Sequence, residues 1–189
     1  MNILKKNYLL ILFGIAAAVL GGFLLYQYTP TAPITSNGIE NFQDDRDTQD
    51  ILRIMKDDWY LLIESEDYSA EHMLKHRAPS QYEPEYFGKM RIKVLRKDDK
   101  VVGFVTYYLQ KTYQGHILFL VIDKDYRGRG YAQKLIHYAL QDLKRMGAAY
   151  VRLVTRVENL AAQKLYSEKL GFEEYGRDRG FVNYAKKLD

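Results

Sequence analysis

The chain has 189 residues, of which 47% are hydrophobic and 28% are charged, and its net charge is +4. It contains no cysteine, which excludes disulfides, cysteine metal sites and an acyl-cysteine intermediate, so any transfer from a thioester must be direct or use another nucleophile. The mild positive charge is compatible with an anionic ligand, but no basic motif accompanies it, and we expect no nucleic-acid partner.

The N-terminal segment predicts a membrane anchor. Residues 8–26 carry no charge and are almost wholly apolar, and a stretch of about 19 such residues can span a bilayer as a helix. Two lysines precede the segment, and tyrosines at its two ends suit the two interfaces. Cleavage as a signal peptide after Ala18 would leave an exposed apolar tail, so we predict an uncleaved single-pass anchor over residues 1–28.

A linker and one domain follow the anchor. Residues 29–46 contain two prolines with polar and acidic residues, a composition typical of a short extended linker. The remaining range, 47–189, has the size of a single domain. It opens with an amphipathic helical pattern capped by Asp47 or Thr48, and a second short helix is predicted near 70–76.

Two histidines on the second helix have the spacing of metal ligands. His72 and His76 lie four residues apart, which places both on one helical face. Met73 stands where a zinc protease motif requires glutamate, and no third ligand is evident. We therefore interpret the pair as part of a solvated helix face and expect no metal.

The middle of the chain predicts strands. The ranges 90–96 and 101–110 are rich in strand-forming residues and flank a turn at 97–100. Residues 117–122 are uniformly apolar, which indicates a central strand covered on both faces. Apolar residues at helical spacing then predict a helix over 132–146.

The turn between this strand and this helix has the form of an anion cradle. It consists of Arg127, Gly128, Arg129, Gly130, Tyr131 and Ala132. The first N–H groups of a helix have no partner within it and carry the positive end of its dipole, and the glycines allow a ligand to approach closely. Phosphate or pyrophosphate is the expected occupant. A dinucleotide turn would need a third glycine where Gln133 stands, while a tight turn without a ligand remains an alternative.

A second pattern lies downstream. A strand-like stretch at 150–157 leads to Asn159, a good helix N-cap, and the helix that it predicts would end at Gly171. Tyr166 lies on the inward stripe of this helix, where it is either a core aromatic or a functional phenol. Two final strands are predicted at 172–175 and 181–186. The order of elements indicates an α/β fold with a mixed sheet.

Together, the two patterns resemble the GNAT superfamily, the acetyl-CoA-dependent N-acetyltransferases. The family's acyl-CoA loop has the form Arg/Gln-x-x-Gly-x-Gly/Ala, which is matched by Arg127, Gly130 and Ala132. Its later motif, Asn-x-x-Ala-x-x-Leu/Phe-Tyr followed by Gly-Phe, is matched by Asn159, Ala162, Leu165, Tyr166, Gly171 and Phe172. The resemblance covers residues 47–189.

The resemblance implies a mixed central sheet with flanking helices and a splayed pair of parallel strands that receives the pantetheine arm. It also implies the binding residues: the backbone at Leu120, Val121 and Ile122 for the acyl-pantetheine, and the amides of Gly128, Arg129, Gly130, Tyr131 and Ala132, next to Arg127, for the pyrophosphate. Asn159 would bind the pantetheine arm, and Tyr166 would protonate the departing sulfur.

The general base is open to more than one interpretation. His116 stands at the start of the central strand, where some family members place a catalytic glutamate, and an imidazole can accept a proton directly or through water. Asp123, bulk water, or a histidine without a role are the alternatives. Glu64, Glu66 and Asp67 lie near the implied acceptor wall, where they would attract a cationic amine or form a solvated loop.

The expected function is direct transfer of an acetyl group from acetyl-CoA to a primary amine, on a small molecule or a protein, by a membrane-tethered enzyme. The competing class is a non-catalytic module that retains the fold as a CoA-binding or interaction surface. The lysines before the anchor favour an external domain, whereas the supply of acetyl-CoA favours a cytoplasmic one, which we expect. The acceptor, the acyl chain and the oligomeric state stay open.

Overall fold

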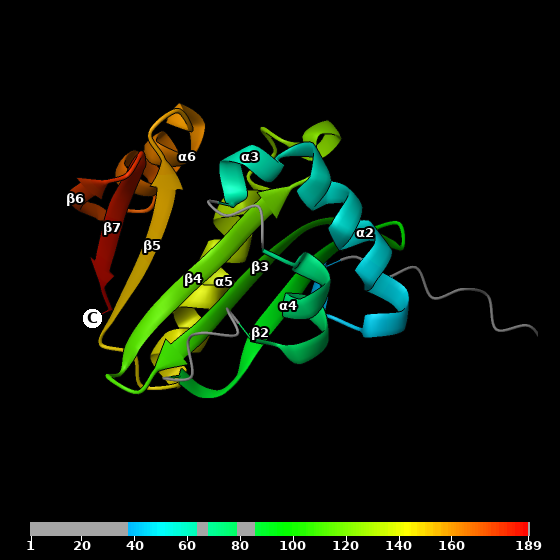
Figure 1. Ribbon diagram of the computed structural model, residues 1–189, viewed down its shortest axis with the longest axis horizontal. Helices are drawn as coiled ribbons and strands as arrows, with labels where there is room; N and C mark the ends of the chain where they lie inside the picture. Colours follow the sequence, from blue (N-terminus) through cyan, green and yellow to red (C-terminus); the bar gives the residue numbers. More distant parts are fainter. Residues whose placement is uncertain (1–37, 64–67, 79–85, 189) are drawn as a thin grey trace, which may run out of the picture. The chain divides into compact units, whose positions relative to one another are not determined.

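The computed structural model describes residues 38–63, 68–78 and 86–188. The predicted anchor, residues 1–28, lies outside these ranges, as do Glu64, Glu66 and Asp67. Among the residues that are described, no helix combines the length and the apolar character needed to cross a bilayer. The described strands form one seven-stranded mixed sheet in the order β1-β2-β3-β4-β5-β7-β6 (Figure 1).

The predicted succession of helical start, hairpin, central strand, helix, strand, helix and final strands is present, with one strand added at the beginning. The strands are β1 (Gly38–Asn41), β2 (Tyr86–Lys97), β3 (Lys100–Gln110), β4 (Gln114–Ile122), β5 (Tyr150–Arg156), β6 (Glu173–Asp178) and β7 (Phe181–Lys187). The helices are α2 (Asp44–Asp57), α3 (Trp59–Leu62), α4 (Ala70–His76), α5 (Tyr131–Arg145) and α6 (Leu160–Lys164). A 3-10 turn, η1 (Lys124–Tyr126), and a π-helical turn, η2 (Leu165–Lys169), complete them.

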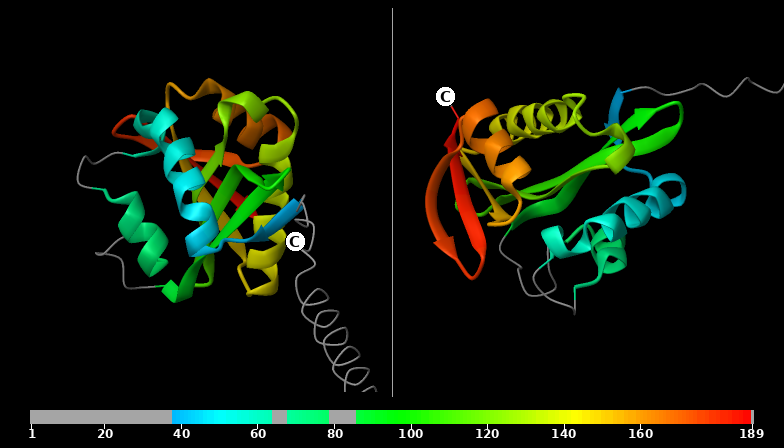
Figure 2. Two further views of the ribbon diagram at one scale, coloured as in Figure 1. Left: turned by 90° about the vertical axis from the view of Figure 1, so that its right-hand side faces the viewer. Right: turned by 90° about the horizontal axis from the view of Figure 1, so that it is seen from above.

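Helices cover both faces of the sheet around β4 (Figure 2). On one face α5 contributes Ile136 to a buried cluster that includes Ile117 of β4. On the other face α2 contributes Ile51 to a second cluster, which includes Phe119 of β4. The strand predicted at 117–122 is therefore covered on both faces, which explains why its sequence shows no polar alternation.

β4 and β5 run parallel at their beginnings and then separate. They pair only over three residues each, and the last pair joins His116 to Arg152. Beyond it, β4 continues to pair with β3 as far as Ile122, and β5 continues to pair with β7 as far as Arg156. The implied splayed pair is confirmed, and Figure 1 shows the two strands diverging. Because each strand has a partner on its outer side, the two backbone edges that face each other across the gap are left for a ligand.

The linker predicted for residues 29–46 is wrong for its described part. Gly38–Asn41 forms β1, which pairs antiparallel with β2. The Nε atom of Arg96 donates a hydrogen bond of 3.3 Å to Glu40 across this pair. Four residues are too few to show an alternating pattern, so the strand is created by its pairing with β2 and has no local signal. The described fold therefore begins at Gly38 rather than at residue 47.

α2 also begins earlier than predicted. Its N-cap is Gln43, not Asp47 or Thr48, and the Gln43 amide donates a hydrogen bond of 2.9 Å back to the Asp47 carboxylate. The same buried carboxylate accepts a hydrogen bond from Arg96. At its other end α2 stops at a corner where Asp58 leaves the helical conformation, and this corner lies beside the pocket described next.

Candidate active site

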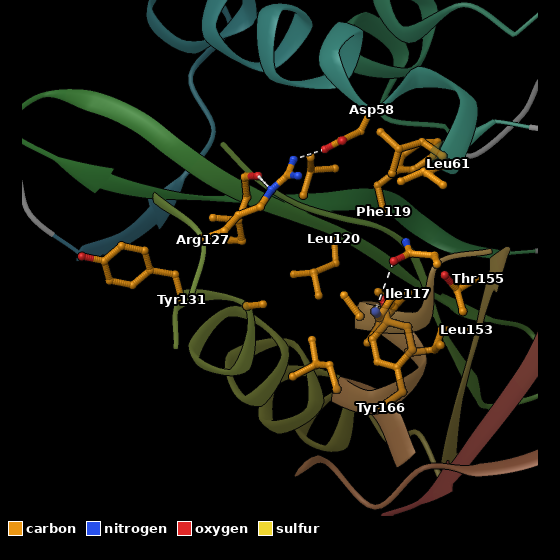
Figure 3. Close-up of a pocket in the computed structure, with 18 of the residues that line it drawn as sticks. Asp58, Leu61, Ile117, Phe119, Leu120, Arg127, Tyr131, Leu153, Thr155 and Tyr166 are labelled. Atoms are coloured by element: carbon orange, nitrogen blue, oxygen red, sulfur yellow. Dashed lines mark hydrogen bonds and ion pairs between the residues drawn. The ribbon is translucent and has the colours of Figure 1, made fainter. Parts of the chain in front are cut away.

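The gap between β4 and β5 contains a pocket of about 470 Å³ (Figure 3). One side of its lining is the loop between η1 and the start of α5, and the other side is formed by β5, α6 and η2. Leu61 and Leu62 of α3 and Phe181 of β7 also line the pocket. The predicted anion cradle and the predicted proton donor therefore lie around one cavity.

The two glycines of the cradle adopt backbone conformations that suit glycine. Gly128 has a φ of 74° and Gly130 a φ of 77°, both in the left-handed region that disfavours residues with a Cβ atom. A Cβ atom added at either position would meet no protein atom within 4 Å. The missing side chains therefore leave free space rather than room for a neighbouring chain, which fits the close approach of a ligand.

The backbone amides of residues 128–133 have no hydrogen-bond acceptor in the described part of the chain. The first helical hydrogen bond of α5 runs from the amide of Lys134 to the carbonyl of Gly130, at 3.1 Å, and Gly130 as N-cap has no side chain to satisfy the amides before it. The amides of residues 131–133 thus have no intrahelical acceptor. Within the described part of the chain no acceptor is found for the amides of residues 128–130 either. Free amides in this arrangement suit an anion, which is the ligand that the sequence predicts for this turn.

The two arginines of the cradle have different roles. Arg127 lines the pocket, donates from Nε to the carbonyl of Ile122 at 2.9 Å, and forms an ion pair with Asp58 (Figure 3). Arg129 does not line the pocket, because its guanidinium donates to the carbonyl of Asp125 at 3.0 Å and lies over the ring of Tyr126. The Arg129 side chain is therefore engaged away from the pocket lining.

The remaining predicted binding residues lie on the pocket wall. Leu120, Val121 and Ile122 of β4 line it, as do Tyr131 and Ala132 at the start of α5. Asn159 lines it from the other side. The side-chain oxygen of Asn159 accepts from the amide of Ala162 at 3.2 Å, as expected of an N-cap, and among the described residues no acceptor is found for its NH₂ group.

Tyr166 lies on η2 at the inner end of the pocket (Figure 3). The helix predicted from Asn159 to Gly171 has two parts, because its last turn is π-helical, a feature often found at functional sites. The ring of Tyr166 packs edge-on against Phe172, with 6.0 Å between ring centroids, and is only 6% exposed. Burial, aided by the nearby phenol of Tyr184, raises the pKa of Tyr166 above its ordinary value, so its proton is retained at neutral pH.

The two candidate bases occupy different surroundings. His116 stacks on Tyr108 of β3, with 5.3 Å between ring centroids, and does not line the pocket, which begins at Ile117. Asp123 holds the η1 turn, because it accepts from Arg53 at 2.7 Å and from the amide of Asp125 at 3.1 Å. Burial opposes ionisation of Asp123, but these hydrogen bonds outweigh it and lower its pKa, which makes the carboxylate a weak proton acceptor.

The histidine pair lies on α4, on a different element from the pocket lining. The rings of His72 and His76 are 4.3 Å apart, and the amide of His72 is bonded to the N-cap Ser69. Within residues 38–63, 68–78 and 86–188, no three groups suited to hold a metal ion come together.

Sequence reasoning missed the part of the lining that faces away from the cradle. Asp58 reaches the pocket from the α2–α3 corner, and Leu61 and Leu62 follow it on α3. Thr155 of β5 and Phe181 of β7 complete this side. These residues match no motif, and only the folding of α3 and β7 toward β5 brings them together.

A splayed parallel pair, with an unpaired helix N-terminus on one side and a buried phenol on the other, defines an acyl-CoA N-acyltransferase fold. The model of the Acetyltransferase (GNAT) family matches residues 48–172, and the chain belongs to this family. The resemblance inferred from the two motifs is thereby confirmed.

Curated relatives match over part of their length. N-alpha-acetyltransferase 30 of Schizosaccharomyces pombe is 46% identical over 66 residues, which are 35% of this chain and 43% of that protein. An uncharacterized N-acetyltransferase of Methanocaldococcus jannaschii is 33% identical over 101 residues, which are 50% of this chain and 44% of that protein. The chain thus spans less than half the length of these relatives.

Solved structures share the fold over most of the chain. The PaiA N-acetyltransferase of Thermoplasma acidophilum, crystallised in complex with coenzyme A, aligns with a TM-score of 0.65 at 20% identity, over 81% of this chain and 99% of that one. The ribosomal-protein-S18-alanine N-acetyltransferase of Escherichia coli aligns with a TM-score of 0.59 at 20% identity, over 80% of this chain and 94% of that one. At this identity the likeness establishes the fold.

Proposed function

We propose that this chain is an acetyl-CoA-dependent N-acetyltransferase that transfers the acetyl group directly to a primary amine, and that the amine is the amino terminus of a peptide or protein. The observation that carries the proposal is that one pocket is lined both by the cradle and by Tyr166. Among the described residues, no acceptor is found for the amides of residues 128–133 of this cradle. The names of the relatives support the acceptor class, because N-alpha-acetyltransferases occur among them.

The chemistry follows from the placement of the groups. The neutral amine attacks the thioester carbonyl, and backbone N–H groups on the open edge of β4 stabilise the oxyanion. When the C–S bond breaks, Tyr166 gives its proton to the sulfur, so the products are the N-acetyl amide and the free thiol of coenzyme A. The phenol regains a proton when the acceptor nitrogen loses its own.

For the base we retain His116. It occupies the last position of β4 that pairs with β5, immediately before the pocket begins, so it would accept, through an intervening water, the proton that the ammonium form of the acceptor must lose before attack. Asp123 is the weaker candidate, since Arg53 and the amide of Asp125 already occupy its oxygens.

The proposal is tested by combining binding with turnover. Acetyl-CoA should raise the melting temperature of the full-length chain, and free thiol should be released in the presence of peptides with a free amino terminus but not of the same peptides after chemical acetylation. Binding of acetyl-CoA without thiol release from any amine would instead support a non-catalytic CoA-binding module.

We also propose that residues 8–26 tether the enzyme to a membrane with the catalytic domain in the cytoplasm, where acetyl-CoA is made. The support is the uncharged apolar run of the sequence and its flanking lysines and tyrosines. A reporter that is active only in the cytoplasm, fused to the C-terminus, should be active in the membrane fraction. An inactive fusion in that fraction would place the domain on the other side.

A further inference from the structure

The pocket opens toward a face of β5 that carries two arginines. Arg152, Val154 and Arg156 alternate along the strand, so they share one face. Val154 is 47% exposed and lines the pocket, whereas Arg152 and Arg156 lie next to the lining residues Leu153 and Thr155 and are not themselves part of the lining. In the sheet, Arg152 stands beside His116. The arginines thus mark the side from which an acceptor would reach the thioester.

Both guanidinium groups lie over aromatic rings, which for Arg156 come from two other elements and for Arg152 from β5 itself and from β6. The Cζ atom of Arg156 lies 4.4 Å from the ring centroid of Tyr60 on α3 and 4.8 Å from that of Phe181 on β7. The Cζ atom of Arg152 lies 5.3 Å and 5.1 Å from the rings of Tyr150 and Tyr175. Stacking fixes the planes of the guanidinium groups and leaves the N–H donors at their rims available.

These donors are mostly unused. Arg156 donates from Nη2 to the carbonyl of Ile63 at 2.9 Å, but its Nε is buried and has no hydrogen-bond partner. The Nε of Arg152 is likewise buried and without a partner. Among the described residues no carboxylate forms an ion pair with either arginine. A buried Nε–H is out of reach of a ligand, so an acceptor carboxylate would bind the Nη groups of Arg152 and the Nη1 group of Arg156, for which no acceptor is found among the described residues.

We propose that Arg152 and Arg156 bind acidic side chains of the acceptor, so that the preferred substrate is a peptide amino terminus followed by aspartate or glutamate residues. This inference rests on the proposed function, because it specifies the acceptor of that same site. Four residues of strand separate the two arginines by about 13 Å, which is more than a free amino acid can span and suits an extended peptide along β5. The exposed rings of Tyr60 and Tyr175 flank this path.

The test uses two synthetic peptides that share a free amino terminus and differ only in carrying glutamate or glutamine from the second position onward. With the full-length chain, kcat/KM for the glutamate peptide should be about tenfold or more higher, and the ratio should fall as salt is added. Free glutamate and free glutamine form a second pair of acceptors. A preference confined to free glutamate would overturn the peptide assignment.

Substitutions of the two arginines test whether these residues cause the preference for the glutamate peptide. Arg156→Gln and Arg152→Gln should each bring the ratio of the two peptides close to one, and Arg156→Lys should restore part of it, because lysine keeps the charge but not the fork of donors. Arg179→Gln is the matched control, since Arg179 lies in the β6–β7 turn with a side chain that is 79% exposed. If Arg156→Gln lowered turnover of both peptides equally, Arg156 would only brace α3 against β7 and the inference would be wrong.

Binding separates this inference from the proposed function. Calorimetry with the coenzyme A complex should show tighter binding of the glutamate peptide, and Arg156→Gln should remove the difference. If the glutamate peptide bound more tightly but neither peptide caused release of thiol from acetyl-CoA, the acidic-peptide site would be supported and the proposed transferase activity would not. If both peptides caused equal release of thiol from acetyl-CoA, the transferase activity would be supported and the acidic-peptide site would not.

Discussion

Asp58 and Arg127 form an ion pair that joins the α2–α3 corner to the loop before α5. The carboxylate of Asp58 is 17% exposed and holds the guanidinium whose Nε also donates to the carbonyl of Ile122. The α2–α3 corner, where we propose that the acceptor binds, is thus fastened to the loop that we propose to hold the phosphates. We therefore expect substrate binding on either side to depend on this contact.

Removing that contact should weaken the cosubstrate site. Asp58→Asn loosens Arg127, and because the arginine side chain is 46% exposed the effect should be modest, about a two- to fivefold rise in KM for acetyl-CoA. Asp57→Asn serves as the control, because it breaks the neighbouring ion pair with Lys124, which is more exposed and outside the pocket lining. Equal changes in the two variants would show that the Asp58 contact has no special role.

Tyr166→Phe should separate chemistry from binding. Loss of the phenolic proton should lower kcat by about 100-fold or more, while the affinity for coenzyme A measured by calorimetry stays the same, since the ring is retained. Tyr184→Phe removes the hydroxyl of a buried neighbour that does not line the pocket and should leave kcat unchanged. Normal turnover in Tyr166→Phe would show that the proton donor is another group or water.

His116→Gln tests the base through the pH profile. A base must be neutral to act, so kcat/KM of the parent should fall as the pH drops and the base becomes protonated. In the variant the part of this fall that belongs to the base should disappear, together with much of the rate at high pH, while the part due to protonation of the acceptor amine stays. On the alkaline side no loss from Tyr166 is expected below pH 10, because burial raises the pKa of that phenol. An unchanged acid limb in His116→Gln would exclude the histidine.

The cradle glycines can be tested against a glycine elsewhere with the same backbone conformation. Gly130→Ala forces a residue with a Cβ atom to a φ of 77° and extends into the open space of the pocket, so it should cost about 1–2 kcal/mol of stability and also weaken coenzyme A binding. Gly180→Ala, at a φ of 82° in the β6–β7 turn, should lower the melting temperature similarly and leave coenzyme A binding intact. The cradle is supported only if Gly130→Ala lowers the affinity for coenzyme A and Gly180→Ala does not.

We expect Asp142 to make a contribution to the free energy of unfolding that is lost in acid. It accepts from Tyr107 at 2.7 Å and from Arg91 at 2.5 Å, and although burial opposes ionisation these bonds lower its pKa below the ordinary 3.8. A lowered pKa stabilises the fold at neutral pH, and this stabilisation is lost as the pH falls below about 4. Asp142→Asn should therefore unfold more easily at pH 7, by about 1.5–3 kcal/mol in urea titrations, with a smaller difference near pH 3.

The sequence predicted those parts of the site that are built locally. The cradle of residues 127–132 and the cap at Asn159 depend on neighbours in the chain, so their motifs carry the geometry with them. The acceptor side could not be predicted in the same way. The stacking of Arg156 between Tyr60 and Phe181 depends on packing between elements far apart in sequence, which leaves no pattern along the chain. β1 had no signal because four residues become a strand only through their partner.

Beyond Arg152, the inner border of β5 is a row of peptide groups without a neighbouring chain. Such a border ordinarily invites a second polypeptide and is a hazard for aggregation. Here it faces inward across a cavity that a slender, amide-bearing molecule can occupy, so the bound cosubstrate takes the position of the missing strand. We therefore expect saturation with coenzyme A to lower any tendency of the protein to self-associate through this border.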